Sequence, residues 1–143
     1  MTPQQKARKL AWQRRQRRAD GNAYSKRYEK TPAGFLMRCY RNMQSRVTGV
    51  QWKKAHLYRS LPLLPRAEFY DWALTSAAFH ILWQQWVRSG YSRKLTPSVD
   101  RINSEQGYAL PNMQWVTHSE NSRAGNVSRH HGPCRSITLR MQA

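Results

Sequence analysis

The sequence predicts an α+β fold, in which a mainly helical N-terminal part is followed by a strand–turn–strand–helix unit. Apolar side chains recur at helical spacing through much of residues 31–92. Residues 95–126 instead contain two extended runs on either side of a turn. At 143 residues the chain is long enough for one domain with an appended arm, and its 16 aromatic residues suffice for a modest core.

The charge of the chain is concentrated in its first half. Residues 1–66 contain 17 Lys or Arg and two acidic residues, for a net charge of +15, whereas the remaining 77 residues carry +3. A core does not need such a charge, but a polyanion rewards it through counterion release. We therefore expect a nucleic acid as the partner. A solubilising basic tail is the simpler alternative. A helix that binds a membrane surface is less expected, because it would also show an apolar face.

Several classes of protein are not expected. The sequence has no stretch of about 18 apolar residues and no apolar block after its basic N-terminus, so neither a membrane span nor a secretory signal is predicted. Cys39 and Cys134 are far apart and form no CxxC pair. They suggest a reducing, intracellular compartment and give no support for a structural zinc site. We expect no membrane partner and no small-molecule cofactor.

Residues 1–30 are predicted to form a basic arm or helix, with a break at Asp20–Asn22. The next helix is predicted to begin with Thr31 as N-cap and Pro32 at its first position, and to end near Gly49. Its apolar positions are Phe35, Leu36, Cys39, Tyr40, Met43 and Val47, and Arg38, Arg41 and Arg46 fall largely on the other side. The apolar stripe is expected to lie in the core.

Residues 31–92 as a whole are predicted to be a helical, DNA-binding and core-forming region. Within it, residues 50–66 form an irregular basic connector. The aromatic pattern from Phe69 to Trp86 predicts two core helices, the second capped by Ser76 and closed by Gly90.

Residues 93–128 form the last predicted folded unit. Its parts are a strand at 95–102, a turn at 103–107, a strand at 113–116 and a short helix. Thr117 and Glu120 fit a capping box at the start of that helix. Gly125–Asn126 is expected to stop it, and residues 129–143 are expected to be a flexible tail.

The candidate chemistry lies in this last unit. Asp100 ends the first strand and Asn121 lies in the first turn of the helix, 21 residues later. A helix laid across a hairpin would bring the two side chains together. Their oxygens suit Mg²⁺ or Mn²⁺ better than zinc, and two protein ligands leave positions for water and phosphate, as metal-assisted phosphodiester cleavage requires. Asn112 follows Pro111 in the loop, and we expect it to hold that loop.

The segments Pro97–Tyr108 (PSVDRINSEQGY) and Pro111–Asn121 (PNMQWVTHSEN) resemble the ββα-metal motif of HNH endonucleases, especially the free-standing, phage-encoded, homing-type members. The resemblance covers residues 95–126, and the upstream order of basic arm and helices is also similar to whole proteins of this kind. It implies a DNA endonuclease that nicks or cuts double-stranded DNA in the host cytoplasm. Asp100 and Asn121 would be its metal ligands, and Asn112 stands at the position of the family's middle letter.

One residue departs from the family pattern. Arg101 stands where the family usually carries the histidine that activates water. Arginine stays protonated, so it cannot accept the proton, although it could grip the scissile phosphate or stabilise the transition state. His118, three residues before Asn121, is one candidate base, and a merely exposed position is the alternative for it. Tyr108 or a metal-bound hydroxide are further candidates.

The candidate catalytic residues are therefore Arg101, His118 and Asn112. The candidate DNA-binding residues are Arg14, Arg15, Arg17, Arg18, Arg38, Arg41, Lys53 and Lys54. Besides the nuclease, two other functions stay open. A catalytically weak or inactive HNH-fold DNA-binding protein is favoured by Arg101. An RNA- or ribosome-associated protein is favoured only by the basic first half, and it leaves the paired oxygen ligands unexplained.

Overall fold

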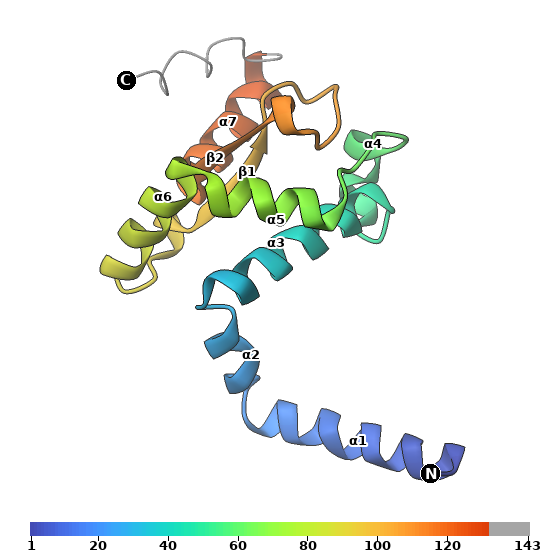
Figure 1. The fold of residues 1–143 in the computed structure, drawn as a ribbon. Helices are drawn as coiled ribbons and strands as arrows, with labels where there is room; N and C mark the ends of the chain where they lie inside the picture. The colour runs from blue at the N-terminus through green and yellow to red at the C-terminus, as the bar shows by residue number, and fades with distance from the viewer. Residues whose placement is uncertain (132–143) are drawn as a thin grey trace. The chain divides into compact units, whose positions relative to one another are not determined.

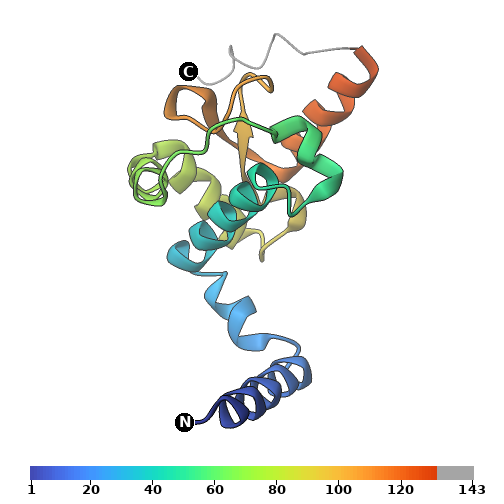
Figure 2. The same ribbon diagram turned by 90° about the vertical axis from the view of Figure 1, so that its right-hand side faces the viewer.

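The computed structural model describes residues 1–131, with side chains up to Gly125. It is a mixed helical and sheet structure, which confirms the α+β prediction. The elements are α1 (Pro3–Ala19), α2 (Ala23–Tyr28), α3 (Pro32–Val47), the 3-10 turn η1 (Trp52–Lys54), α4 (Ala55–Tyr58), α5 (Arg66–Thr75), α6 (Ala77–Arg88), η2 (Arg93–Leu95), β1 (Pro97–Arg101), η3 (Leu110–Asn112), β2 (Met113–Thr117) and α7 (His118–His131) (Figures 1 and 2). Within the described residues, no helix has the length and apolar character needed to span a bilayer.

The chain divides into two compact units, and the first comprises Met1–Arg38. Its helix α1 begins with a capping box made by Thr2 and Gln5 and buries no side chain. The predicted break after α1 is confirmed, because Gly21 and Asn22 adopt positive φ angles of 58° and 59°. Such angles interrupt a right-handed helix.

Helix α3 begins as predicted. The backbone N–H of Gly34 donates to Thr31 Oγ1 over 3.2 Å, so Thr31 caps the helix. The chain turns after Val47, where Gly49 has φ +80°. The prediction for Arg46 was wrong: it is half-buried, and its Nη1 donates to Tyr108 Oη over 3.0 Å, whereas Arg41 is exposed.

The second unit, from Cys39 onward, contains an aromatic core. The predicted break between α5 and α6 is confirmed, with Ser76 Oγ accepting from the N–H of Phe79. Phe79 is fully buried, and its ring centroid lies 4.8 Å from that of Trp115 on β2. Trp72 stacks on the same indole at 5.4 Å, with 13° between the planes. The aromatic pattern therefore forms core, as expected from its spacing.

The connector at 50–66 differs from its prediction in two respects. Residues 52–58 form η1 and α4, which are too short to produce a periodic pattern. Leu63 forms a parallel bridge with Tyr108, where Leu64 N–H donates to the Tyr108 carbonyl and Tyr108 N–H donates to that of Pro62. The connector is thus bonded to the loop between β1 and β2.

Strands β1 and β2 pair antiparallel, with Pro97 opposite Thr117 and Arg101 opposite Met113. Helices α6 and α7 both contact the two strands of the hairpin, and on α6 the ring of Phe79 packs against that of Trp115 (Figure 1). The predicted stop at Gly125–Asn126 was wrong, because α7 continues to His131. Gly125 does not adopt a positive φ, the conformation through which glycine ends a helix. Residues 132–143 of the expected tail lie outside the described residues.

Candidate active site

The pairing of β1 and β2 places the candidate ligand Asp100 away from the aromatic core. Side chains alternate along a strand, so Ser98 and Asp100 share one face of β1 while Val99 lies on the face of the core residue Trp115. The amide Nδ2 of Asn121, on α7, donates to Ser98 Oγ over 2.9 Å. Asn121 is therefore held on the face of the hairpin that carries Asp100.

Helix α7 is positioned by its first turn. Thr117 N–H donates to the Glu120 carboxylate over 2.9 Å, and Glu120 N–H donates to Thr117 Oγ1 over 3.2 Å. The predicted capping box is therefore confirmed. His118 N–H also donates to the Thr96 carbonyl over 2.8 Å, which bonds the start of the helix to the residue before β1.

Asp100 is half-buried, and its Oδ2 accepts a hydrogen bond of 3.0 Å from Gln114 Nε2 on the opposite strand. Burial raises the pKa of Asp100, and the hydrogen bonds from Gln114 and from the Arg101 backbone, together with the charge of Arg101, counteract this only in part. Among the described residues, no cationic side chain lies within ion-pair distance of this carboxylate. A desolvated carboxylate without a paired cation is a suitable ligand for a metal ion.

The donor set also fits a hard divalent cation. Asn121 uses its amide nitrogen for Ser98, which leaves the carbonyl Oδ1 as the atom that would ligate an ion. Together with the Asp100 carboxylate this is an all-oxygen set, which suits Mg²⁺ or Mn²⁺. Over the described part of the chain, no group of three or more His, Cys, Asp or Glu side chains comes together.

The side chain of Asn112 forms hydrogen bonds with the backbone of the loop between β1 and β2. It is only 5% exposed, and its Oδ1 accepts from Asn103 N–H over 2.8 Å. Its Nδ2 donates to the carbonyls of Asn103 and Gly107 over 3.0 and 2.8 Å. These bonds match the loop-holding role expected for Asn112, and any effect on catalysis would be indirect.

Arg101 is held by contacts within the protein. Its guanidinium carbon lies 3.9 Å from the ring centroid of Tyr58 on α4. Its Nη1 donates to the carbonyls of Leu57 and Gln106 over 3.3 and 3.1 Å. By strand alternation Arg101 also lies on the opposite face of β1 from Asp100. The guanidinium therefore contacts Tyr58 and two backbone carbonyls, and the role expected for Arg101 in binding the scissile phosphate stays a prediction.

The two side chains considered as candidate bases, Tyr108 and His118, differ in their exposure to solvent. Tyr108 is 1% exposed and its hydroxyl accepts from Arg46, while burial raises its pKa above the ordinary tyrosine value. Such a phenol holds its proton at neutral pH and is enclosed, which removes Tyr108 as a candidate. His118 is exposed at the first position of α7, one helical turn before Asn121.

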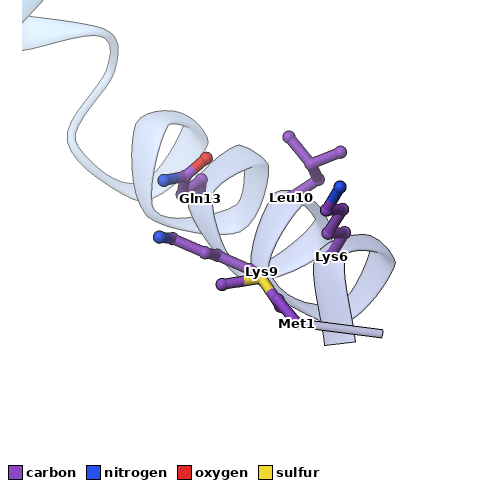
Figure 3. A pocket seen from close by; sticks show the side chains of 5 residues that line it. All are labelled: Met1, Lys6, Lys9, Leu10 and Gln13. Atoms are coloured by element: carbon purple, nitrogen blue, oxygen red, sulfur yellow. The ribbon is translucent and has the colours of Figure 1, made fainter. Parts of the chain in front are cut away.

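The candidate DNA-binding residues are all on the surface. Arg14, Arg15, Arg17 and Arg18 lie on α1, Arg38 and Arg41 on α3, and Lys53 and Lys54 on η1. Arg38 also pairs with Glu29 over 2.9 Å, so a phosphate would compete with that carboxylate. A hollow of about 380 Å³ on α1, lined by Met1, Lys6, Lys9, Leu10 and Gln13, contains no carboxylate (Figure 3).

Sequence reasoning missed the residues that hold the candidate groups in place. Ser98 holds Asn121, Gln114 holds Asp100 and Tyr58 holds Arg101. Ser98 could have been found from its position two residues before Asp100. Gln114 required the strand register, and Tyr58 carries no signal in the sequence pattern.

Comparisons of the chain with protein-family models, with curated proteins and with solved structures found no match.

The Asn112 network gives the first prediction. Asn112→Ala should lower the free energy of unfolding by about 2–4 kcal/mol, because the part-buried N–H of Asn103 and two backbone carbonyls lose their partner. Asn103→Ala is the matched control: it removes one exposed hydrogen bond to Glu105 and should cost less than about 1 kcal/mol. Urea unfolding followed by circular dichroism measures both, and equal losses would contradict the role given to Asn112.

The pKa of Asp100 gives the second prediction. A pKa raised by folding means that the ionised carboxylate destabilises the folded state at about pH 7, and that this cost disappears as the pH falls below the unfolded-state value. Asp100→Asn keeps an acceptor for Gln114 and should melt at the same or a higher temperature at neutral pH, with the difference shrinking in acid. Asp71→Asn, on the exposed surface of α5, is the control. A lower melting temperature for Asp100→Asn at neutral pH would contradict the assignment.

Proposed function

We propose that this chain is a metal-dependent DNA endonuclease of HNH type, which hydrolyses phosphodiester bonds in duplex DNA. The observation that carries the proposal is the hydrogen bond from Asn121 to Ser98, because it holds the amide on the face of β1 that bears Asp100. Two oxygen ligands from opposite ends of a ββα unit are then available on one surface. The motif in Pro97–Asn121 supports the finer assignment to free-standing, phage-encoded homing enzymes, which act in the host cytoplasm.

Asp100 and Asn121 would hold one Mg²⁺ or Mn²⁺ ion. Such an ion, when bound, supplies Lewis acidity towards the phosphodiester. Gln114 orients the carboxylate by donating a hydrogen bond to it, and Ser98 orients the amide by accepting one from it. Each proposed ligand is therefore supported by a neighbouring side chain. Asn112 maintains the loop that follows Asp100.

The proton of the attacking water needs an acceptor. Arg101 cannot serve, and Tyr108 is enclosed and protonated. We assign this role to His118, because it is exposed, lies on the same helix as Asn121 and carries an imidazole, which can accept a proton. Substrate affinity would come from the basic surface of residues 1–66, through phosphate contacts.

A specific observation favours a second candidate, an HNH-fold protein that binds DNA with weak or no cleavage. Arg101 replaces the histidine usual in the family, and its guanidinium is committed to Tyr58 and to two backbone carbonyls. Under this second function the ββα unit has only a structural role, and the basic residues provide the DNA binding.

Cleavage of supercoiled plasmid distinguishes the two. The wild-type protein should convert the plasmid to open-circular or linear DNA with Mg²⁺ and leave it intact with EDTA. Asp100→Asn and Asn121→Ala should each slow the reaction by at least about 100-fold, since the first removes the negative charge of a metal ligand and the second removes a ligand altogether, and both variants should still shift the plasmid on a gel. Asp71→Asn, an exposed carboxylate on α5, should cut at the wild-type rate. A wild-type protein that shifts the plasmid without cutting it would exclude the nuclease and leave the second function.

The assignment of His118 has its own measurement. His118→Ala should reduce the single-turnover cleavage rate by about 10²- to 10⁴-fold without changing DNA affinity, because a general base contributes about that factor. His56→Ala, which removes an exposed histidine on α4, is the control. Full activity of His118→Ala would remove His118 from the mechanism.

A further inference from the structure

Trp52 is an exposed aromatic side chain that the site described above does not use. It begins η1 in the second unit, and 74% of its surface is accessible. It lines a hollow of about 490 Å³ together with Val47, Thr48, Gly49, Ala55 and Arg59. The hollow is formed where the chain turns back at Gly49, and the Gln51 N–H closes that turn by donating to the Ser45 carbonyl over 3.1 Å.

The charged residues near Trp52 in the sequence are all cationic. No acidic residue occurs between Glu29 and Glu68, and Lys53, Lys54 and Arg59 are exposed on the same short segment. The Lys53 ammonium lies 5.7 Å from the centroid of the Trp52 ring. An apolar partner would leave these charges unused, whereas a polyanion with flat aromatic groups matches both the charges and the indole.

The segment that carries Trp52 is bonded to the ββα unit. Tyr58 stacks under Arg101, and its ring lies 5.7 Å from that of Tyr108, with 14° between the planes. Leu57 accepts a hydrogen bond from the Arg101 guanidinium. Arg101 therefore positions residues 52–58 relative to the strand that carries Asp100.

We propose that Trp52 and its hollow form a binding site for an unpaired nucleobase, which stacks on the indole while Lys53, Lys54 and Arg59 contact the adjoining phosphates. The inference rests on the proposed function, and it adds a site that distinguishes unpaired from paired DNA. A base within a duplex has both faces covered by its neighbours, so only an unpaired nucleotide offers a face to the indole.

The test uses the full chain, with EDTA present so that binding is measured without cleavage. Fluorescence anisotropy compares three labelled probes: a short oligothymidylate, an abasic strand of the same length and a duplex. Trp52→Ala should weaken binding of the oligothymidylate by about 5- to 150-fold, the range for one stacked base, and change the other two by less than about twofold. Trp52→Phe keeps a smaller aromatic face and should restore most of the affinity.

Two controls separate stacking from charge and from simple exposure. Val50→Ala removes an apolar side chain of the same 74% exposure and should have no effect. Replacing Lys53 or Lys54 with Gln should lower the salt dependence of oligothymidylate binding by about 0.7 for each phosphate that the variant no longer neutralises, a quantity that Trp52→Ala should leave unchanged.

The inference is overturned if Trp52→Ala weakens none of the probes or all of them alike, or if the wild-type protein binds the abasic strand as tightly as the oligothymidylate. Wild-type protein that binds no probe overturns the inference and the DNA-binding function together. Normal binding to all probes without plasmid cleavage in Mg²⁺ removes only the nuclease, so the failures are distinguishable.

Discussion

The register between β1 and β2 is the constraint on which the candidate site depends. Val99 and Trp115 are paired in this register, and both are directed to the face of the hairpin that meets the aromatic core. Asp100 and Gln114 are then directed together to the other face, where α7 supplies Asn121. A shift of one residue would exchange the two faces, which would bury the carboxylate against tryptophan and expose the core residues. The burial of Trp115 thus indirectly sets the position of the proposed ligand.

Much of the fold could be predicted because its signals are local. A cap and the side chain that it bonds are three residues apart, so Thr31, Ser76 and the Thr117–Glu120 pair could be recognised from the sequence. The hairpin followed from alternation, and the helical parts followed from apolar spacing. The length of α7 could not be predicted, because a glycine ends a helix only when its φ is positive, and composition does not reveal that angle.

The surroundings of the site could not be predicted because they join distant segments. Arg46 looked like one more surface arginine, yet it bonds Tyr108, which is 62 residues away. Tyr108 looked available as a base, yet the bridge to Leu63 helps to enclose it. That α7 would place Asn121 on the face of the hairpin that carries Asp100 was predictable in outline, because a helix that directly follows a hairpin has few ways to pack. The partners that orient both groups depend on the register.

The stack of Arg101 on Tyr58 has an evolutionary consequence. Replacement of Arg101 by a shorter residue would forfeit the carbonyl hydrogen bonds and the cation–π contact, and Tyr58 would lose one of the groups packed against its ring. Positions 58 and 101 are therefore expected to be epistatic, so that each substitution is tolerated only in the background that the other provides.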